Sequence, residues 1–126
     1  MGILKKSVRI ESLKKKMRAL ALLDSGADIS AISNRLAKRL QLKASGRDTI
    51  ETITGKKENV DLVSAKLHFG KTHKFMNFAV MDISDDIIIG HPEMQYNQMT
   101  LDFKNDKIKF KTEKNRPKRL RGVLRI

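Results

Sequence analysis

The chain has 126 residues, a length that suits a single domain with one hydrophobic core. It contains no cysteine, which excludes disulfides and thiolate metal sites, and its 40% hydrophobic and 33% charged residues are typical of a soluble globular protein. The formal net charge of +13 favours anionic partners such as nucleic acid. No apolar run is long enough to cross a bilayer, and the first residues lack the apolar core of a secretion signal. We therefore expect a cytoplasmic protein without membrane contact.

The first predicted elements are a strand and a helix separated by a polar turn. Residues 17–23 form an apolar run that favours a strand buried on both faces, and this run ends at Asp24. Residues 33–40 show the periodicity of an amphipathic helix, because their apolar side chains fall on one face. Either Ser30 or Ser33 can cap the start of this helix.

The middle of the chain is predicted to form paired strands. A strand over residues 49–54 is followed by a turn at Gly55-Lys56 and by a second arm over residues 59–69. The alternation of apolar residues in the second arm slips by one position at Leu62-Val63, which predicts a bulge or a bend. Residues 76–80 alternate again and predict a further strand.

The last predicted elements are a buried strand over residues 86–90, a short helix over residues 92–96 and a hairpin within residues 101–110. Many short strands in this order predict an all-β domain over residues 1–112, with a closed or folded-over sheet and one main helix. Residues 113–126 are basic and form either a tail or a terminal strand.

One polar turn stands out as a candidate site, because it follows an apolar strand directly. The tripeptide Asp24-Ser25-Gly26 is weak evidence alone, since these residues are common in turns. However, residues 21–30 resemble the active-site loop of retropepsins, the retroviral-type aspartic proteases. In that family an apolar-apolar-Gly strand returns beside the loop, and Ile88-Ile89-Gly90 matches this second element. The resemblance covers residues 17–110 and is similar in order and spacing to proteases of gypsy-type retroelements.

The resemblance implies a retropepsin-like β-barrel and an aspartic endopeptidase that acts on polypeptides. This chemistry uses two carboxylates that share one proton, one of which activates a water as general base. The chain has one Asp-Ser/Thr-Gly motif and no room for a second lobe. We therefore expect a two-fold homodimer that brings two copies of Asp24 together. In the resembling retroelements, the substrate is the element's own polyprotein.

The resemblance also assigns roles to individual residues. Asp24, Ser25 and Gly26 would form the catalytic loop, with the Ser25 hydroxyl joining the two loops across the dimer axis. A flap over residues 50–60, with Gly55 at its tip, would close over substrate, although an ordinary surface hairpin is the alternative for this segment. The expected substrate-binding residues are Ala27, Asp28, Ile53, Thr54, Gly55 and Ile89.

The sequence departs from the family pattern in two places. Many retroviral members have Arg after the apolar-apolar-Gly, where it can pair with the acid of the first loop, whereas this chain has His91 facing Asp28. A His91–Asp28 contact would be charge-assisted only with a protonated imidazole, which predicts that dimerisation or stability depends on pH in the His range. The flap also lacks the glycine-rich tip of the family.

No metal or cofactor is expected, because His68 and His73 lack an evident third ligand. Two alternatives to the retroelement protease stay open. One is a catalytically silent dimer of the same fold that binds nucleic acid non-specifically through its basic surface. The other is a stand-alone cellular enzyme with a regulatory substrate. Asp24 distinguishes the protease from the silent binding module, because a pure binding module has no need of that acid.

Overall fold

A computed structural model describes residues 3–52 and 54–111 of the chain. Within these ranges the regular structure consists of nine strands and two short helices. The elements in chain order are β1 (Ile3–Glu11), β2 (Lys16–Asp24), β3 (Ala31–Ser33), α1 (Asn34–Arg39), β4 (Gly46–Glu51), β5 (Lys57–Phe69), β6 (Thr72–Met81), β7 (Ile87–Ile89), α2 (His91–Tyr96), β8 (Met99–Asp102) and β9 (Lys107–Phe110).

Six of the strands close into a barrel. The main sheet has the order β1-β2-β7-β3-β6-β5-β4, and an additional pairing between β1 and β5 joins its two sides. This pairing comprises Arg9↔His68, Ile10↔Leu67 and Glu11↔Lys66. The barrel therefore runs β1-β2-β7-β3-β6-β5 and back to β1, which confirms the predicted all-β fold with a closed sheet.

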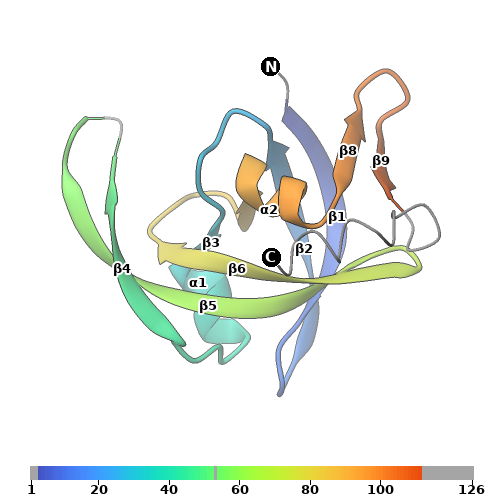
Figure 1. The fold of residues 1–126 in the computed structure, drawn as a ribbon. Helices are drawn as coiled ribbons and strands as arrows, with labels where there is room; N and C mark the ends of the chain where they lie inside the picture. Colours follow the sequence, from blue (N-terminus) through green and yellow to red (C-terminus); the bar gives the residue numbers. More distant parts are fainter. Residues whose placement is uncertain (1–2, 53, 112–126) are drawn as a thin grey trace, which may run out of the picture.

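Two hairpins extend from the barrel on different sides (Figure 1). β4 pairs only with β5, and together they form an arm that rises from one side of the barrel. β8 and β9 form a separate two-stranded sheet after α2, as the sequence predicted. Between the two hairpins lies the loop that connects β2 to β3.

The barrel interior is filled by aliphatic side chains and by Phe78, all of which are nearly inaccessible to solvent. Burying each such side chain contributes about 1.5–3 kcal/mol, which is why alternate residues of the strands are apolar. β2 follows this alternation and corrects one prediction, because it is not buried on both faces. Ala19, Ala21 and Leu23 point inward, whereas Leu20 is 43% exposed because no second layer covers the outside of the barrel there.

The predicted main helix is confirmed as α1, and its cap is Ser33, whose hydroxyl accepts a hydrogen bond from the Leu36 N–H at 3.1 Å. The hydroxyl of Ser30 accepts a hydrogen bond from the Gly90 N–H instead. The short helix after Gly90 is confirmed as α2, with Pro92 in its first turn. None of the helices among the described residues is long and apolar enough to span a bilayer.

The arm differs from its prediction in its boundaries. β4 ends at Glu51 rather than Thr54, because Thr52 N–H donates to the Lys56 carbonyl and the chain turns there. The slip in alternation at Leu62-Val63 is not a bulge, and Figure 1 shows β5 as one long curved strand. The register of β5 is uninterrupted, but Leu62 is where β5 stops pairing with β4 and begins to pair with β6.

Two strands were not predicted. β1 carries an alternating pattern, with Leu4, Val8 and Ile10 buried, but the polar residues between them conceal it. β3 has only three residues, and its place between β6 and β7 depends on partners far along the chain. Residues 113–126 lie outside the described residues, so the predicted tail or strand is not tested.

Candidate active site

The Asp24 turn begins where β2 leaves the barrel. Asp24 is the last residue of β2, and β2 lies between β1 and β7 in the sheet. One carboxylate oxygen, Oδ1, accepts a hydrogen bond from the Gly26 N–H at 3.0 Å, and the Asp24 carbonyl accepts one from the Ala27 N–H at 3.0 Å. The turn therefore orients its own carboxylate with a backbone donor.

The predicted second element lies beside this turn. β7 runs parallel to β2, with Leu23 opposite Ile89, so that Gly90 reaches the turn as β7 ends. A Cβ added to Gly90 would lie 2.7 Å from the Ile29 carbonyl oxygen and 2.8 Å from that of Ala27. Such distances are shorter than real Cβ contacts, so this position requires glycine.

Two hydrogen bonds fix the Asp24 turn to the Gly90 segment. The Gly90 N–H donates to the buried Ser30 hydroxyl at 2.8 Å, and the His91 N–H donates to the Ala27 carbonyl at 2.8 Å. Both donors lie at the start of α2, where backbone N–H groups lack partners within the helix. The turn is thus held by the backbone of the second element, which leaves its carboxylates free to face outward.

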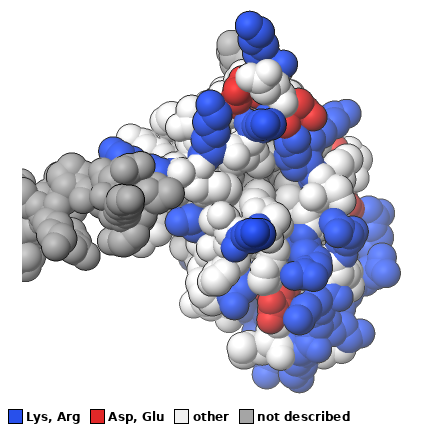
Figure 2. Space-filling model, turned by 90° about the vertical axis from the view of Figure 1, so that its right-hand side faces the viewer, with Lys and Arg blue, Asp and Glu red and all other residues white. Residues whose placement is uncertain are grey.

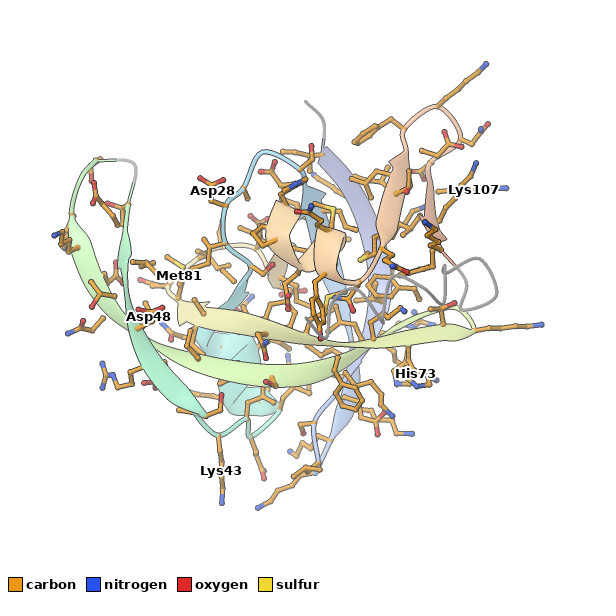
Figure 3. All side chains as sticks on the ribbon, viewed as in Figure 1. Asp28, Lys43, Asp48, His73, Met81 and Lys107 are labelled. Atoms are coloured by element: carbon orange, nitrogen blue, oxygen red, sulfur yellow. The ribbon has the colours of Figure 1, made fainter. Side chains whose placement is uncertain are left out.

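A groove of about 770 Å³ lies between this loop and the β4–β5 arm. Figure 3 shows Asp28 and Met81 on the side of the barrel that faces the arm. The residues that line the groove are Asp24, Gly26, Ala27, Asp28, Ile29, Ile50, Glu51, Thr52, Thr54 and Met81. Among these described lining residues there are three carboxylates and no Lys or Arg, so the groove is both apolar and acidic.

Most predicted site residues are brought together by this groove. Asp24, Gly26, Ala27, Asp28 and Thr54 line it, although the roles assigned to them by resemblance stay predictions. Ser25 is exposed in the turn next to Asp24 and is not among the lining residues.

Two described residues among the predicted substrate-binding set, Ile89 and Gly55, do not line the groove of this subunit. Ile89 has no solvent-accessible surface, because alternate residues of β7 point to opposite sides and Ile87 and Ile89 both face the core. Gly55 lies in the turn of the arm with φ +86°, a conformation that favours glycine, but it is not in the lining. Ile53 lies outside the described residues.

The predicted contact between His91 and Asp28 is absent within the subunit. Both residues are exposed, and no side-chain hydrogen bond or ion pair joins them in the part of the chain that the structure describes. Their segments are linked instead through the backbone, from the His91 N–H to the Ala27 carbonyl. A pH dependence of dimerisation through this pair would therefore need a contact formed between subunits.

Several groove residues were missed by the reasoning from sequence. Ile50, Glu51 and Thr52 lie in the segment expected to form the flap, but they were not among the predicted substrate-binding residues. Figure 1 shows that the curvature of β5 brings this arm up beside the barrel. Met81 ends β6, and it reaches the groove because β6 runs parallel to β3 just after the Asp24 turn. No local pattern in the sequence marks Met81. Within the described ranges, no three His, Asp or Glu side chains gather closely enough to hold a metal ion.

Comparison with known proteins identifies the class to which this barrel and groove belong. A family model described as "Aspartyl protease" matches residues 7–92. The chain therefore belongs to the aspartyl protease family, and its fold is that of the retropepsin-like members. A search of curated proteins finds no match.

Solved structures with the same fold come from cellular and viral proteins. The retroviral protease-like domain of Ddi1 from Leishmania major superposes with a TM-score of 0.65 at 20% identity, covering 89% of this chain and 90% of that domain. The EIAV protease, solved with the inhibitor HBY-793, gives 0.55 at 22% identity, covering 75% of this chain and 88% of the viral one. The foamy viral protease-reverse transcriptase in complex with RNA/DNA hybrid gives 0.53 at 17% identity, covering 75% of this chain and 12% of that one.

Proposed function

We propose that this protein is an aspartic endopeptidase that acts as a two-fold homodimer, with one Asp24 contributed by each subunit. The observation that carries the proposal is the position of Asp24, whose carboxylate faces a groove from a turn fixed by Gly90 and Ser30. Membership of the aspartyl protease family supports the same chemistry.

The proposed mechanism uses the two Asp24 carboxylates as a unit. Two carboxylates in contact cannot both carry a negative charge cheaply, so they share one proton. The ionised member takes a proton from a water, which attacks the scissile carbonyl, and the protonated member donates to the carbonyl oxygen. The hydrogen bond from the Gly26 N–H holds the Asp24 carboxylate in place during this exchange.

The β4–β5 arm is proposed to act as the flap. Ile50, Glu51, Thr52 and Thr54 line the groove opposite the Asp24 loop, which is where a cover over a bound peptide has to lie. Because β4 pairs only with β5, the arm can move without breaking the barrel. The substrate would lie extended in the groove with alternate side chains in pockets.

The catalytic role of Asp24 is tested by incubating the full chain and its Asp24→Asn variant with a peptide library at mildly acidic pH. We expect kcat/KM to fall by at least about 10³-fold in the variant, because the exchange of protons is removed while the shape is kept. Asp106→Asn is the matched control, since Asp106 lies in the exposed β8–β9 turn with φ +55°, which Asn also tolerates. Equal cleavage by the wild type and Asp24→Asn would refute the proposal.

The sharing of one site between subunits is tested by mixing. When wild-type and Asp24→Asn chains are mixed in equal amounts and allowed to exchange, random pairing leaves about one quarter of the dimers with two acids. Cleavage should fall to about a quarter of that of an all-wild-type sample at the same total concentration, rather than to half. A value of one half would show that each subunit works alone.

We further propose that the substrate is a retroelement polyprotein. The support is the similarity in fold to viral proteases, including one whose solved chain also contains a reverse transcriptase. The similarity to the Ddi1 domain supports the alternative of a cellular enzyme. Sequencing of the DNA that flanks the gene separates the two, because a retroelement would place a reverse transcriptase in the same reading frame or beside it.

A further inference from the structure

The outer surface of the barrel carries an ordered array of basic side chains that the proposed protease activity does not use. It lies on the four adjacent strands β2, β1, β5 and β6, and Figure 3 shows His73 on the far side of the barrel from Asp28. We call this array the basic sheet face. It comprises Lys16, Arg18, Arg9, Lys66, His68, His73 and Phe75, with Glu11 among them.

The strand register arranges the basic sheet face in two rows. In the first row, Arg18 pairs with Arg9, Arg9 with His68, and His68 with His73, so that four basic side chains cross four strands. Their sequence neighbours Val8, Ala19 and Leu67 are buried, which places the row on the outside of the barrel.

The second row adds an aromatic ring. Lys16 pairs with Glu11, Glu11 with Lys66, and Lys66 with Phe75. Phe75 is 66% exposed, and the Lys66 ammonium lies 5.3 Å from the centre of its ring. An exposed ring with a cation over it differs from an ordinary surface apolar residue, because it offers a stacking surface next to a positive charge.

The positive charge of this face is only weakly compensated. Glu11 is the one acid in the two rows, and it is bound to His68, with 2.8 Å between Oε1 and Nε2. Arg9, Arg18, Lys16 and Lys66 take part in none of the ion pairs formed by residues 3–52 and 54–111. Figure 2 shows Lys and Arg gathered over much of this side of the molecule, with acidic side chains only in small groups among them.

The dimensions of the array suit a single nucleic-acid strand. Adjacent strands lie about 4.8 Å apart, so each row spans about 14 Å, and the rows lie about 7 Å apart along the strands. Cations at this spacing can contact successive phosphates, while the ring of Phe75 can stack on a base. A duplex hides the faces of its bases, so an exposed ring beside Lys66 favours a single strand over a duplex.

We propose that the basic sheet face binds single-stranded nucleic acid, with Arg9, Arg18, Lys16 and Lys66 on phosphates and Phe75 stacked on a base. Contacts to phosphates carry no sequence information, and every base has a face that can stack on a ring, so we expect the binding to tolerate different sequences. It lies apart from the groove, so the proposal does not depend on catalysis.

The test uses the full chain with Asp24→Asn, so that proteolysis plays no part. Binding of fluorescent 12-nucleotide oligouridine and oligothymidine is measured by anisotropy between 50 and about 300 mM salt, beside a duplex of equal length. Phe75→Ala should weaken single-strand binding about 5- to 100-fold, because it removes the ring on which a base stacks. Phe75→Leu should weaken binding to a similar extent, since leucine keeps the apolar area but has no ring. The double variant Arg9→Gln/Arg18→Gln should reduce the slope of log K against log salt by about 1.4.

Matched controls remove the same groups elsewhere on the surface. Lys38→Gln/Lys43→Gln removes two exposed cations of α1 and the following loop, and Tyr96→Ala removes an 80% exposed ring of α2. Both controls should bind oligonucleotides as the parent does. All variants keep residues 113–126, so the basic residues there contribute equally.

Three outcomes would overturn the proposal. Equal weakening by the controls would mean diffuse attraction to the whole basic chain. Equal binding of duplex and single strand, with no effect of Phe75→Ala, would mean a general polyanion surface. Binding to phosphatidylserine vesicles that is lost in the face variants, without loss of oligonucleotide binding, would assign the face to membranes.

Discussion

The groove and the basic sheet face lie on one small barrel, but they are built from different parts of its strands. The groove is made where β2 and β6 end, by the loop that follows β2 and by the arm that leaves the barrel, and its described lining carries Asp24, Asp28 and Glu51. The basic sheet face is made from outward residues of four paired strands and carries four Lys and Arg side chains. The net charge of +13 therefore does not describe how the charge is distributed, because the groove is acidic while the basic sheet face is positive.

The difference shows how one barrel can hold two chemistries without conflict. The acidic groove repels phosphates, while the basic sheet face attracts them, so a polyanion should bind away from the groove. If the two regions are independent, a change in one should leave the other intact. The following predictions test this separation, beginning with the largest effect.

Gly90→Ala should damage the groove most severely. The added Cβ would meet the carbonyl oxygens of Ala27 and Ile29, which cannot move without disturbing the Asp24 turn. We expect the free energy of unfolding to fall by about 3 kcal/mol in urea titrations. The folded fraction should still bind oligonucleotides.

Gly46→Ala is the control for this change, because a Cβ at Gly46 meets nothing within 4 Å. Its stability should change by less than about 1 kcal/mol. An unaltered unfolding midpoint for Gly90→Ala would contradict the tight packing of Gly90 against the turn.

Ser33→Ala should lower the stability of the whole domain without changing the function of the groove or of the basic sheet face. The Ser33 hydroxyl caps α1, and its loss leaves the Leu36 N–H without that partner, at a cost of about 1 kcal/mol. Urea unfolding measures the loss, and peptide cleavage and oligonucleotide binding should both be unchanged under native conditions. Ser45→Ala, at an exposed serine before β4, should have a smaller effect.

Glu51→Gln should sharpen the contrast by making the groove less acidic. If substrate lies in the groove, peptides with Lys or Arg opposite Glu51 should be cleaved about 2- to 5-fold less efficiently, as expected for an exposed charge pair. Competition between matched Lys and Gln peptides measures this ratio. Glu58→Gln, which removes an acid of β5 outside the groove, should leave the ratio as it was.

Glu11 supplies the smallest prediction and concerns the basic sheet face. The hydrogen bond to the His68 ring lowers the pKa of the Glu11 carboxyl from its ordinary value of 4.5, and Lys16 and Lys66 act in the same direction. Because the folded-state pKa is the lower one, the stabilisation is present above about pH 4.5 and is lost as the pH falls through the folded value.

The measurement is the difference in melting temperature between wild type and Glu11→Gln from pH 7 to pH 3. It should be small at neutral pH and should vanish in acid. A difference that grows on acidification would contradict the direction of the shift.

Local patterns were sufficient for the parts of the fold whose partners lie close in the chain. α1 with its Ser33 cap, α2 with Pro92, and the β8–β9 hairpin follow from periodicity, capping and turn residues. The pairing of β7 with β2 was anticipated only through the resemblance to a family, because paired residues such as Leu23 and Ile89 are 66 positions apart in the sequence.

The remaining features depend on contacts between distant residues. Met81 enters the groove through the pairing of β6 with β3, and Ile89 leaves it because β7 turns that side chain inward. The sequence shows basic residues without an aromatic pattern among them. The pattern exists only once Lys66 is set opposite Phe75 and Arg9 opposite His68.

The seam where β1 meets β5 is three residue pairs wide, and two of those pairs, Arg9 with His68 and Glu11 with Lys66, belong to the basic sheet face. A ligand bound along either row would bridge the two edges that close the barrel. Such a ligand would stabilise the closed barrel, so the melting temperature should rise with the concentration of oligonucleotide.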